Sequence, residues 1–323
     1  MTEEATTSRG GTQTLVGRLL ENKKATVGLF VVVGFTLLAV VAPWLVRDPS
    51  EFLAVPLQPP SSEFWLGTTG QGQDVFAQTL VGARTSLAIG FFVGVTVIVI
   101  GTSVGLAAGY YGRRIDDLLT LLINVFLILP GLPLAVVIAA YLPPGPVTLA
   151  FVLIITGWSW HARVIRAQTL SLRHKDFVSA AIVAGESNLR TMFFEILPNM
   201  ASLIVSGFIG ATVYAILAQV GLEFLGLGDV SQVTWGTNLY WAANNAALLT
   251  ESWWTIVPTG LAIALVGFAL VMINFAIDEV TNPRLKVEGH FTRVLKDANV
   301  RPGISTPVVK MAGAGRKAAN PSG

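Results

Sequence analysis

Long stretches without a single Asp, Glu, Lys or Arg dominate the pattern of polar and apolar positions along the chain. A helix needs about 20 apolar residues to cross a bilayer, and each stretch approaches or exceeds that length. Each stretch is apolar on all sides rather than at alternate positions, which is not the pattern of a membrane β-barrel. The pattern predicts an all-α integral membrane protein with six spans, at residues 25–46, 85–112, 118–142, 147–167, 197–222 and 253–277.

Prolines divide the longest of these stretches. Leu118–Ala162 is too long for one helix, and it contains a Pro-Pro-Gly-Pro run at 143–146. Because proline cannot donate a helical hydrogen bond, this run predicts a tight turn between the third and fourth spans. A Pro-Gly pair at 130–131 and Pro133 lie inside the third span. They are compatible with a broken helix, but we expect the commoner arrangement, a helix kinked at proline.

The basic residues predict the orientation of the spans. With the N-terminus inside, all of the 21 Lys and Arg residues fall in inner segments except Arg47 and Arg84. We therefore expect both termini in the cytoplasm, with residues 1–24 as a cytoplasmic N-terminal segment that leads into an uncleaved first span. The outer loops are then residues 47–84 and 223–252.

The tryptophans and the C-terminal residues give further expectations about the regions outside the membrane. Residues 287–323 follow a six-span domain at 25–286 and are rich in Gly, Ala, Pro and Ser, so we expect a disordered basic tail. Such a tail is either simply solvated or contacts anionic lipid or a partner. The tryptophans at outer span ends are expected to be interfacial anchors or to pack a small outer cap; they are Trp44, Trp65, Trp235, Trp241, Trp253 and Trp254.

The longest inner connection, the coupling loop 168–196, has a helical pattern. Phe177, Ala180, Ala181 and Ala184 recur at i, i+3, i+4 and i+7, which is the spacing of an apolar helical stripe. Because the stripe is mostly alanine, another backbone could approach it closely. Gly185 is suited to end that helix. The loop is therefore expected to be a docking device, or alternatively an amphipathic helix lying in the lipid headgroups.

A second short helix is expected after Gly185. Ser187 or Asn188 can cap it, because both side chains carry an oxygen that accepts from a free backbone N–H. Met192, Phe193 and Ile196 are expected on one side of this helix.

The composition excludes several classes of function. Hydrophobic residues make up 53% and charged residues 12% of the 323 residues, too few charges for an ordinary soluble domain. Cys is absent, so there is no disulfide, thiol nucleophile or zinc-thiolate site. The chain lacks the His-Glu-x-x-His, Gly-x-Ser-x-Gly and P-loop motifs. We therefore expect no enzyme, no metal and no cofactor in this chain.

The spans also hold almost no ionisable groups, whereas ion-coupled carriers need buried charges at membrane depth. His161 near the inner end of the fourth span is expected to be structural. Asp116 and Asp117 beside Arg113 and Arg114 resemble a metal or salt-bridge cluster, but we expect a solvated turn. These features favour a passage whose gating energy comes from a partner.

The coupling loop contains Ser179-Ala180-Ala181 and then Gly185, and Ile196-Leu197-Pro198 follows at its end. In these residues the sequence resembles the permease subunits of bacterial ABC importers. Their motif is Glu-Ala-Ala, three residues, Gly, and about ten residues to Ile-Leu-Pro. The resemblance implies that residues 174–198 form the coupling helix, which inserts into a cleft on the ATPase subunit. Ser179 stands in place of the family's Glu, so that acidic contact is not expected here. The implied coupling residues are Ser179, Ala180, Ala181, Ala184, Gly185, Glu186, Leu197 and Pro198.

Four further regions resemble the peptide branch of this family, the dipeptide, oligopeptide and nickel importers, in its second-permease type. The first outer loop departs from the branch at Thr69 and Gln73, and the second outer loop lacks the usual proline pair. The outer-loop motif includes Trp65, Gly67, Asp74 and Arg84. The other matches are Ala107-Ala108-Gly109-Tyr110, Phe224-Leu225-Gly226-Leu227-Gly228 with Trp235-Gly236, and Pro283-Arg284-Leu285.

The resemblance implies a type I ABC importer permease fold in the bacterial cytoplasmic membrane. It implies a second permease subunit, one or two cytoplasmic ATPase subunits that carry ATP and Mg, and an external substrate-binding protein, with membrane lipid but no nucleic acid as a further partner. The implied cargo is di- or oligopeptides; nickel, haem or another small solute is the alternative. A remote alternative is an ATP-independent channel or scaffold subunit. Gln219 and Glu223 are candidates for the pore or gate, with helix packing and capping as the plainer alternative.

Overall fold

The computed structural model describes residues 22–52 and 54–281. The predicted C-terminal tail, the match at Pro283-Arg284-Leu285 and most of the predicted N-terminal segment lie outside the described residues. Within the described ranges the chain is helical and has no strand, which agrees with the predicted all-α class.

Five described helices are long and apolar enough to cross a membrane, and the count is six when the bent pair of α4 and α5 is taken as one span, which agrees with the predicted number. The elements are α2 (Lys23–Leu45), α3 (Val75–Tyr111), α4 (Arg113–Ile128), α5 (Gly131–Tyr141), α6 (Pro146–Arg173), α7 (Asp176–Val183), α8 (Asn188–Arg190), the π-helix η1 (Thr191–Ile196), the 3₁₀-helix η2 (Leu197–Met200), α9 (Ala201–Phe224), α10 (Trp235–Asn244), the 3₁₀-helix η3 (Trp253–Thr255) and α11 (Val257–Thr281).

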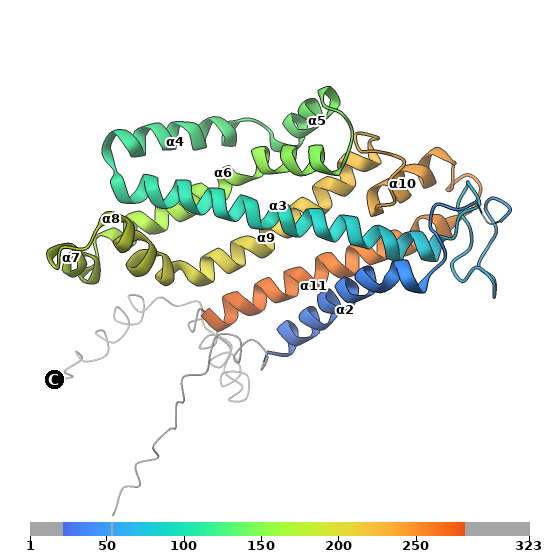
Figure 1. The fold of residues 1–323 in the computed structure, drawn as a ribbon, viewed down its shortest axis with the longest axis horizontal. Helices are drawn as coiled ribbons and strands as arrows, with labels where there is room; N and C mark the ends of the chain where they lie inside the picture. The colour runs from blue at the N-terminus through green and yellow to red at the C-terminus, as the bar shows by residue number, and fades with distance from the viewer. Residues whose placement is uncertain (1–21, 53, 282–323) are drawn as a thin grey trace, which may run out of the picture. The chain divides into compact units, whose positions relative to one another are not determined.

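Helix α3 is the central element of the spans and packs against α2, α4, α6, α9 and α10 (Figure 1). Its 37 residues give a length of about 55 Å at 1.5 Å per residue, well beyond the ~30 Å hydrocarbon core. Asp74 begins the helix by accepting a hydrogen bond from the Phe76 N–H at 2.9 Å. The second span was predicted to begin at residue 85, so the helix extends further into the outer loop than expected.

Small residues allow α3 to lie close to α6. A Cβ atom added to Gly109 would approach the Thr169 side chain to 2.6 Å, and one added to Gly105 would meet the Ala162 carbonyl. Such close approach increases van der Waals contact between the two helices. This contact matters in a membrane because the hydrophobic effect does not drive helices together in lipid.

The third span is broken, not kinked. Helix α4 ends at Ile128, α5 begins at Gly131, and the two axes differ in direction by 85°. The expectation of one proline-kinked helix over 118–142 was therefore wrong. Pro130 explains the break, because its ring clashes with the carbonyl one turn earlier and it lacks an N–H. The turn predicted at 143–146 is present, since α5 ends at Tyr141 and α6 begins at Pro146.

The two ends of the spans carry different structures (Figure 1). Helices α7 and α8 lie at one end, where α3 finishes and α6 continues to Arg173. At the opposite end the first outer loop and α10 gather around the beginning of α3. We name these two parts after the roles and sides predicted for them: residues 174–198 are the coupling segment, and residues 46–74 with 225–256 are the outer cap.

Candidate functional sites at the two ends of the spans

Helix α7 of the coupling segment ends at the predicted glycine. Gly185 has a φ of +82°, in the region that side chains disfavour. Its N–H donates to the Ile182 carbonyl at 3.0 Å, and the Glu186 N–H donates to the Ala181 carbonyl at 3.1 Å. These two bonds form a Schellman motif, which satisfies carbonyls left free at the end of a helix.

The buried face of α7 differs from the predicted stripe. Val178 is fully buried and Ala181 is 9% exposed, whereas Phe177 is 37% exposed and Ala184 is exposed. Ala181 therefore lies on the inward side of α7 with Val178, and its predicted contact with an ATPase cleft stays a prediction. Alanines gave the stripe its spacing, but the larger Val178 determines which side is buried. The outward positions are Ser179, Ala180, Ile182, Val183, Ala184 and Gly185.

The second half of the coupling segment begins at Ser187, whose hydroxyl accepts from the Arg190 N–H at 3.4 Å. The chain continues through the π-turns of η1 and the 3₁₀-turn of η2 before α9 begins. Met192 and Ile196 are buried as predicted, but Phe193 is 49% exposed, so its placement on the same side was wrong. The wider π-turn explains the difference, because it changes the angular spacing on which the prediction relied.

The coupling segment is attached to two spans. The Tyr110 hydroxyl, in the last turn of α3, donates to Asn188 Oδ1 at 3.1 Å. A hydrophobic cluster joins the same elements, and its fully or nearly buried members are Leu106, Tyr110, Ile165, Val178, Met192, Ile196 and Met200. The motif around Tyr110 was noted in the sequence, but its bond to Asn188 was not predicted, because nothing in the spacing relates two residues 78 positions apart.

A second attachment fixes α4 to α6 near this end. Arg166 contacts Asp116 through two bonds, Nε to Oδ1 at 2.5 Å and a terminal nitrogen to Oδ2 at 2.8 Å. The Thr120 hydroxyl also donates to Asp116 at 2.9 Å. The expected solvated turn is therefore wrong for Asp116, which is paired across helices rather than with its neighbouring arginines.

Within the coupling segment, Glu186 lies 3.3 Å from Arg190, one turn further along. One carboxylate oxygen of Glu186 is buried without a hydrogen-bond partner among the described residues. Leu197 is partly buried and Pro198 is exposed at the junction with α9. These positions complete the set of residues that the family motif assigned to coupling.

The outer cap uses the four predicted motif residues in different ways. Asp74 is buried and caps α3, and Gly67, with a φ of +72°, lies under Trp254, where a Cβ atom would come within 2.7 Å of the indole. Trp65 is 68% exposed and its ring centroid lies 5.3 Å from that of Phe76. Arg84 is exposed and forms no ion pair with the described part of the chain. Asp74 and Gly67 thus build the cap, whereas Trp65 and Arg84 lie on its surface.

Trp235 closes the outer cap against the spans. It is fully buried, its indole N–H donates to the Thr79 carbonyl at 3.0 Å, and its backbone N–H donates to the Ser86 hydroxyl at 3.1 Å. Both partners belong to the outer part of α3. The prediction of cap-packing tryptophans therefore holds for Trp235.

The candidate gate residues Gln219 and Glu223 lie in the core, not on an open surface. Gln219 is fully buried and its Nε2 donates to Glu223 Oε1 at 3.1 Å. Glu223 is 3% exposed, and its other oxygen accepts from the Thr234 hydroxyl at 2.6 Å. These bonds connect the outer end of α9 to the residue that caps α10. The geometry favours the packing and capping alternative.

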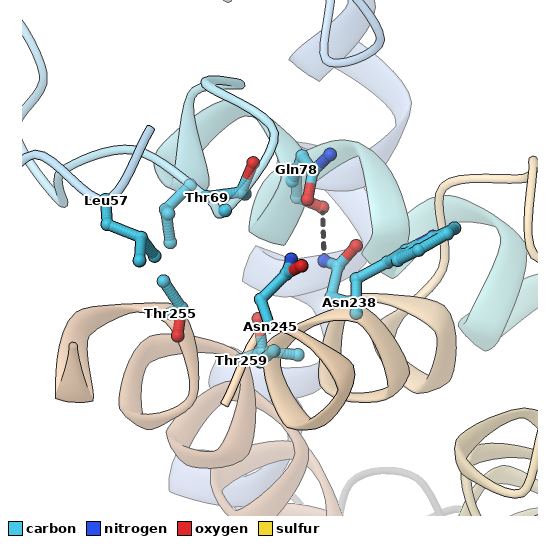
Figure 2. Close-up of a pocket in the computed structure, with 11 residues that line it drawn as sticks. Leu57, Thr69, Gln78, Asn238, Asn245, Thr255 and Thr259 are labelled. Carbon is cyan, nitrogen blue, oxygen red and sulfur yellow. Dashed lines mark hydrogen bonds between the residues drawn. The ribbon is translucent and has the colours of Figure 1, made fainter. Parts of the chain in front are cut away.

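A small polar pocket lies inside the outer cap (Figure 2). Figure 2 shows Leu57 and Thr69 of the first outer loop facing Asn245 and Thr259, with Asn238 donating to the Gln78 carbonyl at 3.1 Å. Its volume of about 10 Å³ is about the space that one water needs. This pocket therefore holds at most a water.

Two protein families match parts of this chain. Residues 101–287 match the family described as the binding-protein-dependent transport system inner membrane component. Residues 12–60 match the N-terminal transmembrane domain of oligopeptide transport permease C.

Relatives cover most of the chain. The dipeptide transport system permease protein DppC of Alkalihalophilus pseudofirmus is 35% identical over 277 residues, 83% of this chain and 88% of the relative. The di/tripeptide transport system permease protein DppC of Pseudomonas aeruginosa is 36% identical over 275 residues, 82% and 89% of the two chains. The oligopeptide transport system permease protein OppC of Mycobacterium bovis is 32% identical over 255 residues, 77% and 87%.

The family match covers more than half of the 323 residues, and the six-span architecture and the coupling segment agree with it. The chain belongs to the family of inner membrane components of binding-protein-dependent transport systems, the multi-pass permease subunits of ABC importers, in its peptide-transport branch.

Proposed function

We propose that this chain is one permease subunit of an ATP-driven importer that moves di- or oligopeptides across the cytoplasmic membrane. The observation that carries the proposal is the similarity, over most of its length, to permeases named for dipeptide, di/tripeptide and oligopeptide transport. The structure adds a chain built of apolar spans, with one structured segment at the end opposite the outer cap.

The coupling segment is the part that receives energy from the ATPase. Its outward face, with Ala180, Ala184 and Gly185, offers small side chains that a cleft on a partner can approach closely. Its inward face, with Val178 and Ala181, is packed against the spans. A rigid movement of the partner is thereby delivered to the helices, in an alternation between two states that the partner binds differently.

The proposed orientation follows from the charges. Of the described basic residues, Arg47 and Arg84 lie toward the outer cap, and the others lie toward the coupling end or its adjoining helix ends, which is the cytoplasmic side under the positive-inside rule. The family works with a second permease, ATPase subunits and a binding protein. We assign ATP and Mg to the ATPase subunits and delivery of the peptide to the binding protein, which meets the outer cap.

Gentle purification from native membranes tests the assembly. The proposal predicts recovery of a P-loop ATPase and a second six-span protein with this chain, and a binding protein that binds short peptides. If the chain is recovered alone, under conditions that keep other membrane complexes intact, the importer assembly is wrong. If the binding protein instead binds nickel or haem and not peptides, the assembly stands and the cargo is wrong.

A further inference from the structure

A cavity of about 620 Å³ lies among the spans, far larger than the pocket in the outer cap. Its walls come from α3, from the break between α4 and α5, and from the facing sides of α6 and α9. Sites that hold small molecules in proteins typically measure about 300–1,000 Å³. The cavity therefore has room for a solute.

The walls combine apolar surface with uncharged polar groups. Phe126, Trp160 and Leu203 supply apolar surface, and Ser159 and Tyr214 are among the polar residues of the wall. Among the described residues that line the cavity there is no Asp, Glu, Lys or Arg, and His161, whose Nε2 lies 3.1 Å from the Thr102 hydroxyl, is a further polar group of the wall. Such a wall suits a solute whose central part is uncharged and carries both amide groups and apolar side chains.

The broken third span also contributes to the wall, through Leu129 and Gly131. The first N–H groups of α5 have no partner within their own helix. Irregular backbone at membrane depth is tolerated only where it is buried in protein or borders a wet cavity. The break thus brings the beginning of α5 to the wall of the cavity.

Gly210 of α9 lies in the wall of the cavity, and a Cβ atom added there would meet no atom within 4 Å. A larger side chain at this position would therefore extend into the cavity without displacing a neighbouring helix. Gly267 of α11 also has open space for a Cβ atom but lies outside the wall, so it is a matched control.

We propose that this cavity receives the uncharged part of a peptide in transit, its backbone and one apolar side chain. The proposal rests on the proposed function, because it takes a peptide as the cargo. It assigns to this chain a size limit for peptide side chains, in addition to any selection by the binding protein. A helix of the second permease or a lipid tail filling the cavity would be the competing occupant.

The test uses the complete importer in proteoliposomes, with dialanine and alanylphenylalanine as probes. Gly210→Leu should lower uptake of alanylphenylalanine at least tenfold and change uptake of dialanine less than twofold. Gly267→Leu should leave the ratio of the two uptake rates unchanged. Equal losses for both peptides with Gly210→Leu, or no loss, would overturn the size limit.

Cysteine labelling distinguishes the occupants. The chain has no cysteine, so Gly210→Cys gives a single thiol on it. In the assembled importer, we expect a small maleimide to label this thiol and alanylphenylalanine to slow the labelling. If the thiol stays unlabelled with and without the peptide, another group fills the cavity. The same conclusion follows if the peptide does not change the rate of labelling. If the wild-type importer transports neither peptide, the proposed function itself fails, and the inference fails with it.

Discussion

The Tyr110 hydroxyl donates a 3.1 Å hydrogen bond to the Asn188 side chain and so connects the last turn of α3 to the coupling segment. Tyr110 is only 8% exposed, and its ring belongs to the same cluster as Val178 and Ile196. Helix α3 reaches from this point to the outer cap, where Trp235 bonds to Thr79. One helix thus connects the coupling segment to the outer cap, the two parts of the chain to which we assign the contacts with the ATPase and the binding protein.

Tyr110→Phe should uncouple transport from ATP hydrolysis without unfolding the protein. A neutral hydrogen bond contributes about 0.5–1.5 kcal/mol to stability, and the ring would keep its packing. We expect more ATP hydrolysed per peptide transported, measured with the complete importer in proteoliposomes. Tyr111→Phe is the control, because the neighbouring ring lies on the more exposed side of the helix. An unchanged ratio in Tyr110→Phe would contradict a role for this bond in coupling.

Gly185→Trp should leave membrane insertion intact and abolish ATP-driven uptake. Nothing lies within 4 Å of a Cβ atom at this position, so the bulky ring would project from the outward face into the ATPase contact. Residue 185 has a φ of +82°, which costs an L-residue roughly 1–2 kcal/mol. Gly185→Asn separates the two effects, because asparagine tolerates this conformation and is small. Normal transport by Gly185→Trp would refute the docking assignment.

Glu223→Ala should destabilise the protein and leave the ratio of the uptake rates of different peptides nearly unchanged. It would leave the Thr234 hydroxyl and the Gln219 amide without their acceptor, and each buried unsatisfied group costs about 1–3 kcal/mol. We expect a lower midpoint of thermal unfolding in detergent. Glu223→Gln keeps an oxygen acceptor and should lower the unfolding midpoint by less than Glu223→Ala does. A stable Glu223→Ala protein with altered transport would instead support the gate hypothesis.

Asp116→Asn should loosen α4 from α6. The pair with Arg166 has two bonds and is mostly shielded, with side-chain exposures of 16% and 27%. Its loss should cost about 1–3 kcal/mol, between the values for surface and buried pairs. A double-mutant cycle with Arg166→Gln measures the coupling energy. Strictly additive effects of the two substitutions would mean that the pair contributes nothing.

The sequence predicted where the helices lie better than it predicted which side of each helix is buried. Five long uncharged stretches, the longest of them divided by the Pro-Pro-Gly-Pro run, predict six spans, so the number of spans was recoverable from the sequence pattern. Gly185 was predicted to end a helix because a left-handed residue at that point favours glycine. The buried side of α7 was not recoverable, since Phe177 and Val178 are both apolar and only tertiary packing decides between them.

The remaining errors have the same origin. A proline at 130 permits a kink or a break, and the packing of α5 on α6 selects the 85° break. Glu223 has the same charge whether it lines a pore or caps a loop, and only its bond to Thr234 separates the two. The cavity among the spans involves residues up to about 120 positions apart, from Val97 to Tyr214, which no local pattern relates.

Uptake of labelled dialanine into proteoliposomes that contain the complete importer is the most direct test of the central claim. Uptake should require ATP on the side of the membrane that carries the ATPase subunits. It should also require the binding protein on the opposite side, and this chain in the membrane. It should fall to background when Gly185→Trp replaces the native chain. Peptide uptake that continues without ATP, or without this chain, would contradict the account.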